Sequence, residues 1–340
     1  MVNLSALNFY LCYKDPHLKK FLIIRFSSIG DIVATTAVIR CLKKTYPESK
    51  IHYLCKSAYA EVLGTNPYID KLHLFNGSLK DCLKELRKEK FDLIIDLHKS
   101  LRSRLVKHAL FKPSISYSKL NVRKWIFTNF KKDLLPDQHI NDRYFRSLQK
   151  IKVPYDDNGM DFFIKNNSEE VLEILPLTFK HGFYAIVIGA GHNTKQLTIE
   201  KHIELIDQLG LPVVLIGGEV DFEMGRQIVN ASKNEVFNSC GLLSIQESAA
   251  LINAAEKVVT NDTGMMHIAA ALNKDMVVIW GSTHPKFGLF PLQAGGTSRV
   301  DNVSVKIKCR PCSKIGYDKC PKTHFRCMKD QNVDEILSLL

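Results

Sequence analysis

The sequence lacks any run of about 20 uninterrupted apolar residues, the length that a membrane-spanning helix requires. Its longest apolar runs have the length of a β-strand and end in glycine or a charged residue. The first eleven residues are mildly apolar, but they lack the basic segment and the small-residue cleavage site of a secretory signal peptide. We therefore expect a cytoplasmic protein that does not span a membrane.

Two sequence signatures of other protein classes are also missing. No Gly-x-Gly-x-x-Gly follows the first predicted strand, which disfavours an NAD enzyme. No recognisable nucleic-acid-binding module occurs, so a basic nucleic-acid-binding protein is only a distant alternative.

The composition, with 45% apolar and 24% charged residues, lacks the polar bias of a disordered chain. A length of 340 residues favours two globular domains.

Short runs rich in isoleucine and valine alternate with amphipathic segments of helical length, which is typical of parallel strands joined by crossover helices. We predict helices at residues 32–45 and 79–90. The predicted strands are residues 21–26, 51–55, 93–96, 184–188, 212–216, 257–260 and 276–280. A polar, turn-rich stretch near residues 154–176 suits a linker. The pattern predicts an α/β protein with two Rossmann-like domains, whose parallel sheets face each other across a cleft.

Positive charge is concentrated in the first half of the chain. Up to Met160 there are 29 Lys and Arg against 15 Asp and Glu, whereas the remainder has 18 against 20. This asymmetry indicates an anionic partner of the first half, such as nucleic acid, anionic lipid or a phosphorylated substrate. An ordinary solvated basic surface explains the counts equally well.

The loop that follows the first predicted strand reads Arg-Phe-Ser-Ser-Ile-Gly-Asp over residues 25–31. In open α/β sheets, ligands bind beyond the carboxyl ends of the strands, so a site is expected here. Gly30 permits a tight turn, and Asp31 lies at or just before the start of the next helix. Asp31 is a candidate functional carboxylate, with a simple helix N-cap as the alternative.

Three loops in the second half follow successive predicted strands. Residues 261–267 open a helix, whose free N–H groups and positive dipole end suit a diphosphate; His267 faces the ligand or packs under the loop. Small residues let the backbone of 189–195 approach a ligand, and Lys195 neutralises phosphate charge. Glu219 follows a strand, and an acid in this position holds the ribose hydroxyls in other nucleotide-binding proteins. Together these loops indicate a nucleotide diphosphate, bound by Gly189, Gly191, Lys195, Gly218, Glu219, Asp262, Thr263, Gly264 and His267.

In these motifs the chain resembles glycosyltransferase family 9, the family of the ADP-heptose:lipopolysaccharide heptosyltransferases. The resemblance also covers residues 96–103, the Cys-Arg-Pro-Cys at 309–312 and the Cys-Met at 327–328. It implies a GT-B fold, an inverting mechanism without a catalytic metal or other cofactor, an acceptor-binding domain at 1–160 and a donor-binding domain at 161–340. Aromatic or Trp-Pro residues common after the family's lysine are replaced here by Gln-Leu-Thr at 196–198.

The resemblance also implies roles for individual residues. Asp31 resembles the catalytic base, Lys195 and the Thr263–Gly264 turn resemble diphosphate contacts, and Asp262 resembles a donor-binding acid. If Asp31 is the base, Asp31→Ala should fold normally and lose nearly all transfer. We expect acceptor contacts from the loops that follow the first and third predicted strands, at Ser28, Gly30, His98, Lys99 and Arg102.

The expected reaction transfers heptose from ADP-heptose to the lipopolysaccharide inner core, at either Kdo-lipid A or the first heptose. A different nucleotide sugar, used in cell-surface polysaccharide synthesis, is the alternative. Such an anionic glycolipid acceptor would explain the basic first half. The segment 125–130 has basic flanks and suits peripheral contact with the cytoplasmic face of the inner membrane, although a core helix would look similar.

The nine cysteines fall into two groups. Five read as small buried apolar residues. Four cluster near the end of the chain, at Cys309, Cys312, Cys320 and Cys327, and in a cytosolic protein such a group suggests zinc more than disulfides. The last two lack the paired spacing of a zinc ribbon, so a metal site there stays open.

Overall fold

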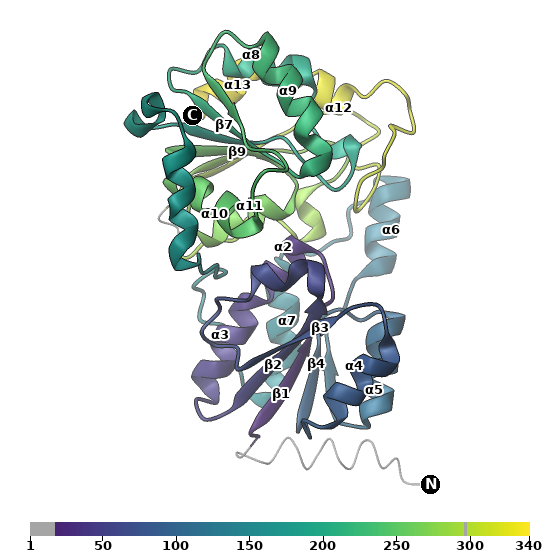
Figure 1. Cartoon of the computed structure of the whole chain (residues 1–340). Coiled ribbons are helices and arrows are strands. Elements are labelled where there is room, and N and C mark those ends of the chain that lie inside the picture. The colour runs from purple at the N-terminus through teal and green to yellow at the C-terminus, as the bar shows by residue number, and fades with distance from the viewer. Residues whose placement is uncertain (1–17, 296–297) are drawn as a thin grey trace. The chain divides into compact units, whose positions relative to one another are not determined.

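A computed structural model describes residues 18–295 and 298–340. The chain divides into two compact units (Figure 1). The first unit comprises the described residues up to 119 together with 138–163, and the second unit comprises 120–137 and 164–340. The eleven N-terminal residues assessed for a signal peptide lie outside the described residues. None of the helices within the described ranges has the length and apolar character needed to cross a bilayer.

The first unit contains a five-stranded parallel sheet in the order β3-β2-β1-β4-β5. Its central strands are almost fully buried, because helices cover both faces. The strands are β1 (Lys20–Ile24), β2 (Lys50–Lys56), β3 (Lys71–Phe75), β4 (Leu93–Asp96) and β5 (Ser114–Ser116).

Helices lie on both sides of this sheet. Figure 1 shows α4 (Leu79–Arg87) and α5 (Leu101–Leu110) on one side, and α3 (Thr36–Thr45) and α7 (Ile140–Leu148) on the other. Before α3, the short helix α2 (Ile29–Ala34) begins directly after the β1 loop. The predicted helix at 32–45 is therefore two helices, which meet at Thr35.

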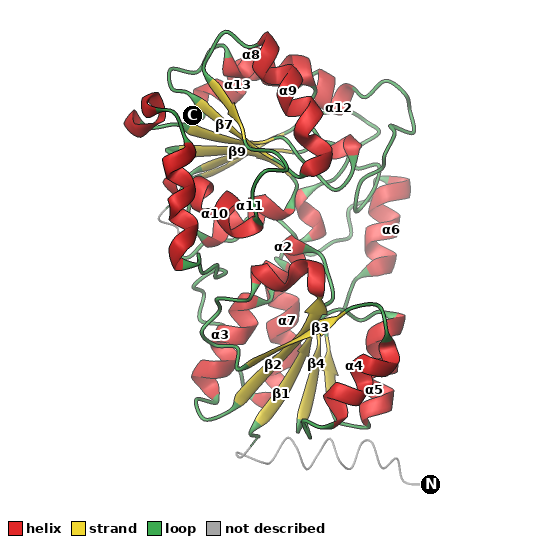
Figure 2. Ribbon diagram, viewed as in Figure 1, coloured by secondary structure: helices red, strands yellow, loops and turns green. Residues whose placement is uncertain are grey.

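The second unit contains a six-stranded parallel sheet in the order β11-β10-β9-β6-β7-β8 (Figure 2). Helices again cover both faces, and an apolar core lies between them and the strands. The strands are β6 (Tyr184–Val187), β7 (Val213–Ile216), β8 (Val236–Asn238), β9 (Lys257–Asn261), β10 (Met276–Ile279) and β11 (Val300–Val303). The α-helices are α6 (Asn121–Phe130), α8 (Ile199–Ile206), α9 (Phe222–Ala231), α10 (Ile245–Ala254), α11 (Gly264–Ala271), α12 (Arg326–Lys329) and α13 (Val333–Ser338).

Helix α6 belongs to the second unit, although it precedes part of the first unit in sequence. The ring of Phe127 packs edge-on against His284 and Phe287, and Lys131 Nζ donates to the backbone oxygen of Pro311 at 2.7 Å. The chain enters the second unit again after residue 163. Most of the stretch predicted as a linker before that point is anchored to the first unit, since Arg40 pairs with Asp156 and Asp161.

Candidate functional site

In each sheet the chain builds outward from the first strand on one side and then crosses to its other side, which creates a topological switch point. In the first unit this point lies between β1 and β4, and in the second it lies between β6 and β9. Loops leaving two such neighbouring strands diverge and create a ligand-binding crevice beyond their carboxyl ends. The motifs at 25–31, 96–103, 189–195 and 261–264 all follow these four strands. The structure thus brings the predicted residues of each unit to one edge of its sheet.

Arg25 joins the two loops at the switch point of the first unit. Its guanidinium donates to the backbone oxygens of Ser27 and Leu97, each at 2.7 Å. The same group lies 2.6 Å from Asp31 Oδ2. Burial acts to lower the pKa of Arg25, but the adjacent Asp31 carboxylate and the neighbouring tyrosines together outweigh burial and leave this pKa raised. A permanent buried cation therefore holds Asp31 in place.

Asp31 occupies the third position of α2 and is not its N-cap. Ser28 precedes the helix in an extended conformation and is the capping residue. Its backbone N–H and its Oγ contact Asp31 Oδ2 at 3.4 and 3.1 Å. The Asp31 side chain is 19% exposed, so solvent or a ligand can reach it. Gly30 is buried within the same helix.

Asp96 builds the second loop of this unit. Its fully buried carboxylate accepts from the backbone N–H groups of His98 and Lys99 at 3.0 and 2.7 Å. Ser103 Oγ and Lys107 Nζ complete its contacts, each at 3.0 Å. Because these contacts come from the turn after β4 and from α5 itself, Asp96 ties the turn to the helix that follows it.

The three remaining acceptor candidates have different surroundings. His98 packs edge-on against Phe26, and burial together with the Arg25 cation lowers its pKa to about 4, so the ring is neutral at pH 7. Lys99 Nζ donates to the backbone oxygen of Tyr117 at 3.1 Å. Arg102 is exposed above the Phe75 ring and has no ion-pair partner within the described ranges. Its charge is therefore available to an anionic ligand.

In the second unit, Lys195 and Asp262 meet across the switch point. Lys195 Nζ lies 2.9 Å from Asp262 Oδ2, and Thr283 Oγ1 donates to the same oxygen at 2.7 Å. Thr283 comes from the loop after β10 and was not predicted as a site residue. Its only sequence signal is its place in the Gly-Ser-Thr-His run after a buried strand.

Helix α11 begins beside this ion pair. Thr263 is its N-cap residue in an extended conformation, without a side-chain hydrogen bond to the first turn. The N–H groups that open the helix are thus not satisfied by their own cap, as a phosphate site requires. Gly264 is the first helical residue, and His267 is buried inside the helix.

The glycine-rich loops are connected by Asp221, another residue missed in the sequence. Asp221 Oδ2 accepts from the Gly218 N–H at 2.8 Å, and Oδ1 accepts from Gln196 Nε2 at 3.0 Å. A Cβ on Gly189 would lie 2.3 Å from Asp221 Oδ2, so this glycine accommodates a protein carboxylate. At Gly191, by contrast, a Cβ would have nothing within 4 Å, which leaves room for a ligand. Glu219 is exposed after β7.

The C-terminal cysteines lie in a segment that supports the Lys195 loop. Thr194 exchanges hydrogen bonds with the backbone of Tyr317, and Arg310 donates to the backbone oxygen of Gly281. Cys309 Sγ is 3.7 Å from His324 Nε2, and Cys312 Sγ donates to the Cys309 oxygen at 3.2 Å. Within 18–295 and 298–340, no three of these thiol and imidazole groups gather at metal-ligand spacing. A zinc site there stays an open prediction.

The chain is similar in sequence to known proteins. The family described as Glycosyltransferase family 9 (heptosyltransferase) matches residues 80–321. Lipopolysaccharide heptosyltransferase 1 of Campylobacter coli is 24% identical over 295 residues, which cover 78% of this chain and 84% of the relative.

Two solved structures share the fold. A family 9 glycosyltransferase from Veillonella parvula has a TM-score of 0.77 at 22% identity, covering 95% of this chain and 96% of that chain. The E. coli ADP-heptose lps heptosyltransferase II has a TM-score of 0.69 at 22% identity, covering 92% and 98%. The prediction of a GT-B fold with two parallel α/β domains is confirmed.

Proposed function

The chain belongs to glycosyltransferase family 9, as its motifs predicted, and we propose that it transfers heptose from ADP-heptose to the inner core of lipopolysaccharide. The acceptor is Kdo-lipid A or the first heptose. The observation that carries the proposal is the Lys195–Asp262 pair at the start of α11, because it combines a cation with the uncapped N–H groups that a diphosphate needs.

The donor is bound by the second unit. Its diphosphate takes the Lys195 ammonium from Asp262 and accepts from the first N–H groups of α11. Asp262 then keeps its Thr283 contact and orients toward the sugar or ribose. The open space at Gly191 admits the phosphates, and the exposed Glu219 carboxylate is placed to accept from ribose hydroxyls. These contacts involve only protein groups and require no metal ion.

The acceptor is bound by the first unit, where Asp31 is the general base. It takes the proton of the acceptor hydroxyl while the oxygen of this hydroxyl forms a bond to the anomeric carbon. The bond from this carbon to the diphosphate breaks on the opposite face, so the configuration inverts. Negative charge on the leaving diphosphate is stabilised by Lys195 and the helix N–H groups; removing one such donor typically costs about 3 kcal/mol.

The acceptor carries phosphates and carboxylates, and the same loops supply cations. Arg102 is the best placed, because it is exposed and stacks on Phe75 at the edge that bears Asp31. Ser28 and Gly30 shape the end of the β1 loop and the first turn of α2, while His98 and Lys99 shape the β4 loop. His98 is neutral and acts as a hydrogen-bonding group rather than as a charge.

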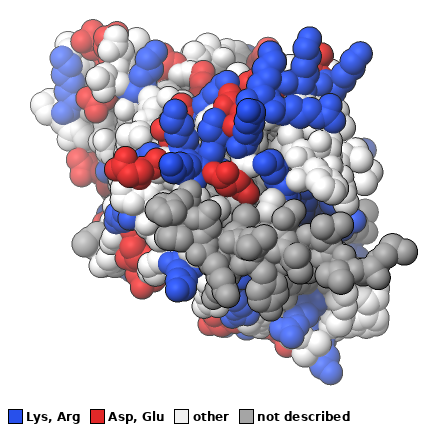
Figure 3. Space-filling model, turned by 90° about the horizontal axis from the view of Figure 1, so that it is seen from below, with Lys and Arg blue, Asp and Glu red and all other residues white. Residues whose placement is uncertain are grey.

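We place the enzyme at the cytoplasmic face of the inner membrane, as a peripheral protein. Figure 3 shows Lys and Arg side chains gathered along one side of the face it presents. Trp125 and Phe130 on α6 are 56% and 66% exposed, between basic residues. Each such charge near anionic lipid adds about 1 kcal/mol of attraction. Binding to vesicles should thus require anionic lipid and weaken with salt; indifference to both would refute docking.

Thermal unfolding with a panel of nucleotide diphosphates tests the donor. A ligand that binds only the folded chain raises the unfolding temperature. We expect ADP to do so more than UDP or GDP, and we expect Lys195→Ala to abolish the effect. Lys201→Ala is the matched control, since Lys201 pairs with Glu204 on the surface of α8. A preference for UDP or GDP would instead support the alternative donor.

A further inference from the structure

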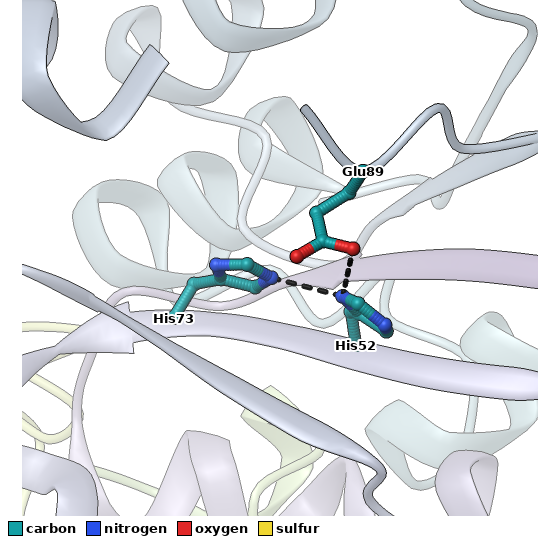
Figure 4. Close-up of side chains that lie close together, drawn as sticks. All are labelled: His52, His73 and Glu89. Atoms are coloured by element: carbon teal, nitrogen blue, oxygen red, sulfur yellow. Dashed lines mark hydrogen bonds and ion pairs between the residues drawn. The ribbon is translucent and has the colours of Figure 1, made fainter. Parts of the chain in front are cut away.

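Two histidines and a glutamate gather in the first unit, away from the loops described above. His52 comes from β2, His73 from β3 and Glu89 from the segment after α4 (Figure 4). One ligand atom of each lies within 4.8 Å of the others. His52 is in the N-terminal half of its strand, whereas Asp31 and Arg102 follow the carboxyl ends of strands. The cluster is therefore separate from the proposed catalytic residues.

The ring nitrogens are oriented toward one another. His52 Nδ1 and His73 Nε2 are 2.9 Å apart, and Glu89 Oε2 is 3.8 Å from His52 Nδ1. On the other side of its ring, His73 Nδ1 lies 2.6 Å from Glu85 Oε1. Since a carboxylate accepts, His73 Nδ1 carries the proton, and its Nε2 lone pair points into the cluster. A carboxylate on the outer nitrogen is the usual partner of a metal-binding histidine.

The surroundings also suit an ion. Both imidazoles are buried, and His52 shares its face of β2 with Leu54, which belongs to the same apolar core as Leu86 of α4. Leu54, Leu86 and Phe91 lie in the apolar core on this face, and the Phe91 ring packs edge-on against both histidines. Glu89 is 17% exposed and leaves an entry path from solvent. Apolar walls around a few convergent ligands strengthen coordination by excluding competing water.

We propose that His52, His73 and Glu89 form a site for a divalent transition-metal ion of the zinc type. Zinc bonds of about 2.0–2.1 Å at tetrahedral angles place two ligand atoms roughly 3.3 Å apart. The observed separations of 2.9 and 3.8 Å bracket this value. Binding requires the His52 proton to lie on Nε2, and a water molecule completes the four ligands. The ion ties β2, β3 and the end of α4 together and takes no part in sugar transfer.

Two lysines compete for Glu89 in the metal-free chain. Lys20 Nζ is 3.1 Å from Oε2, and Lys71 Nζ is 2.6 Å from Oε1. Metal binding displaces Lys20 from the ligand oxygen, while Lys71 can keep the other. This competition weakens the affinity for the ion. The alternative to a metal site is a metal-free chain of hydrogen bonds that runs from Glu85 through His73 to His52.

The test is Zn²⁺ binding by the full chain after chelator treatment, measured by equilibrium dialysis and metal analysis. Cys309→Ser/Cys312→Ser is the background, so that the Cys-Arg-Pro-Cys thiols do not contribute. We expect one Zn²⁺ per chain there, loss of binding in His73→Gln, and no change in the exposed control His108→Gln. Co²⁺ bound at the site should show tetrahedral visible bands without a thiolate charge-transfer band.

A surface variant covers the case in which His73→Gln fails to fold. Glu85 is 46% exposed, and Glu85→Gln leaves every ligand in place. Loss of such an outer carboxylate should weaken Zn²⁺ binding about 10–100-fold. Absence of Zn²⁺ from the double-serine background, or unchanged affinity in a folded His73→Gln or Glu85→Gln, would overturn the proposal.

Discussion

The ion pair between Arg25 and Asp31 gives Asp31 a structural role in addition to its proposed catalytic role. Replacement by alanine would remove the base and would also leave the Arg25 guanidinium, which is buried, without its carboxylate. We therefore expect Asp31→Ala to fold but to be less stable than wild type. Asp31→Asn keeps an oxygen that can accept from Arg25, so it separates the structural role from the catalytic role.

The magnitude follows from the burial of both partners. Removing one member of a fully buried pair costs about 3–5 kcal/mol. Here Asp31 is partly exposed, and Arg25 keeps two backbone oxygens as acceptors, so we expect a loss of about 2 kcal/mol for Asp31→Ala. Because the residues are in contact, combining Arg25→Gln with Asp31→Ala should cost less than the two single losses together, by about 1–2 kcal/mol.

Denaturant unfolding of the four chains measures this coupling, and a transfer assay at saturating donor and acceptor measures turnover. General-base catalysis contributes about 10²–10⁴-fold, so Asp31→Asn should lose turnover by this factor while its free energy of unfolding stays within about 1 kcal/mol of wild type. Strictly additive stability losses would refute the pairing. Turnover by Asp31→Asn above about a tenth of wild type would refute the base.

Three further outcomes are expected. Lys195→Ala should lower kcat about a hundredfold or more, with Lys201→Ala unchanged in the same assay. Gly189→Ala should destabilise the fold by about 1–3 kcal/mol in urea unfolding, because its Cβ would meet Asp221, and Asp221→Ala should relieve part of this loss. Burial lowers the pKa of His202 to about 3, below its value of about 6.5 in the unfolded chain. The unfolded chain is then protonated first as pH falls, so His202 should destabilise the fold by about 2–3 kcal/mol between pH 7.5 and 4.5, and His202→Leu should lack this part of the loss.

The success of the strand predictions depended on burial. The seven strands that were predicted are the interior strands of the two sheets, where both faces are covered and the sequence is almost continuously apolar. The four that were missed, β3, β5, β8 and β11, are the sheet edges. Edge strands are less buried, as the partly exposed β8 and β11 show, so their composition resembles that of loops.

The candidate site residues at strand ends could be predicted for a related reason. Their place in the chain fixes their place at the sheet edge, so Asp31, Lys195 and Asp262 could be proposed from the sequence. Two other contacts of these loops could not, because Asp221, which binds Gln196, and Thr283, which binds Asp262, reach the loops from other strand ends. His52 and His73 are 21 residues apart, and only the register of β2 against β3 brings them together. Local patterns thus predicted the loops, and long-range packing supplied their contacts.

The charge asymmetry gains a sharper meaning once the units are known. Helix α6 and its basic flanks belong to the second unit, although they lie in the basic half of the sequence. By unit, the first has 25 Lys and Arg against 14 Asp and Glu, and the second has 22 against 21. The excess therefore follows the unit that carries Asp31 and Arg102, even after α6 is removed from it. A nucleotide sugar bound by a nearly neutral unit relies on a few local contacts, whereas an acceptor with several anionic groups gains from the field of the whole first unit.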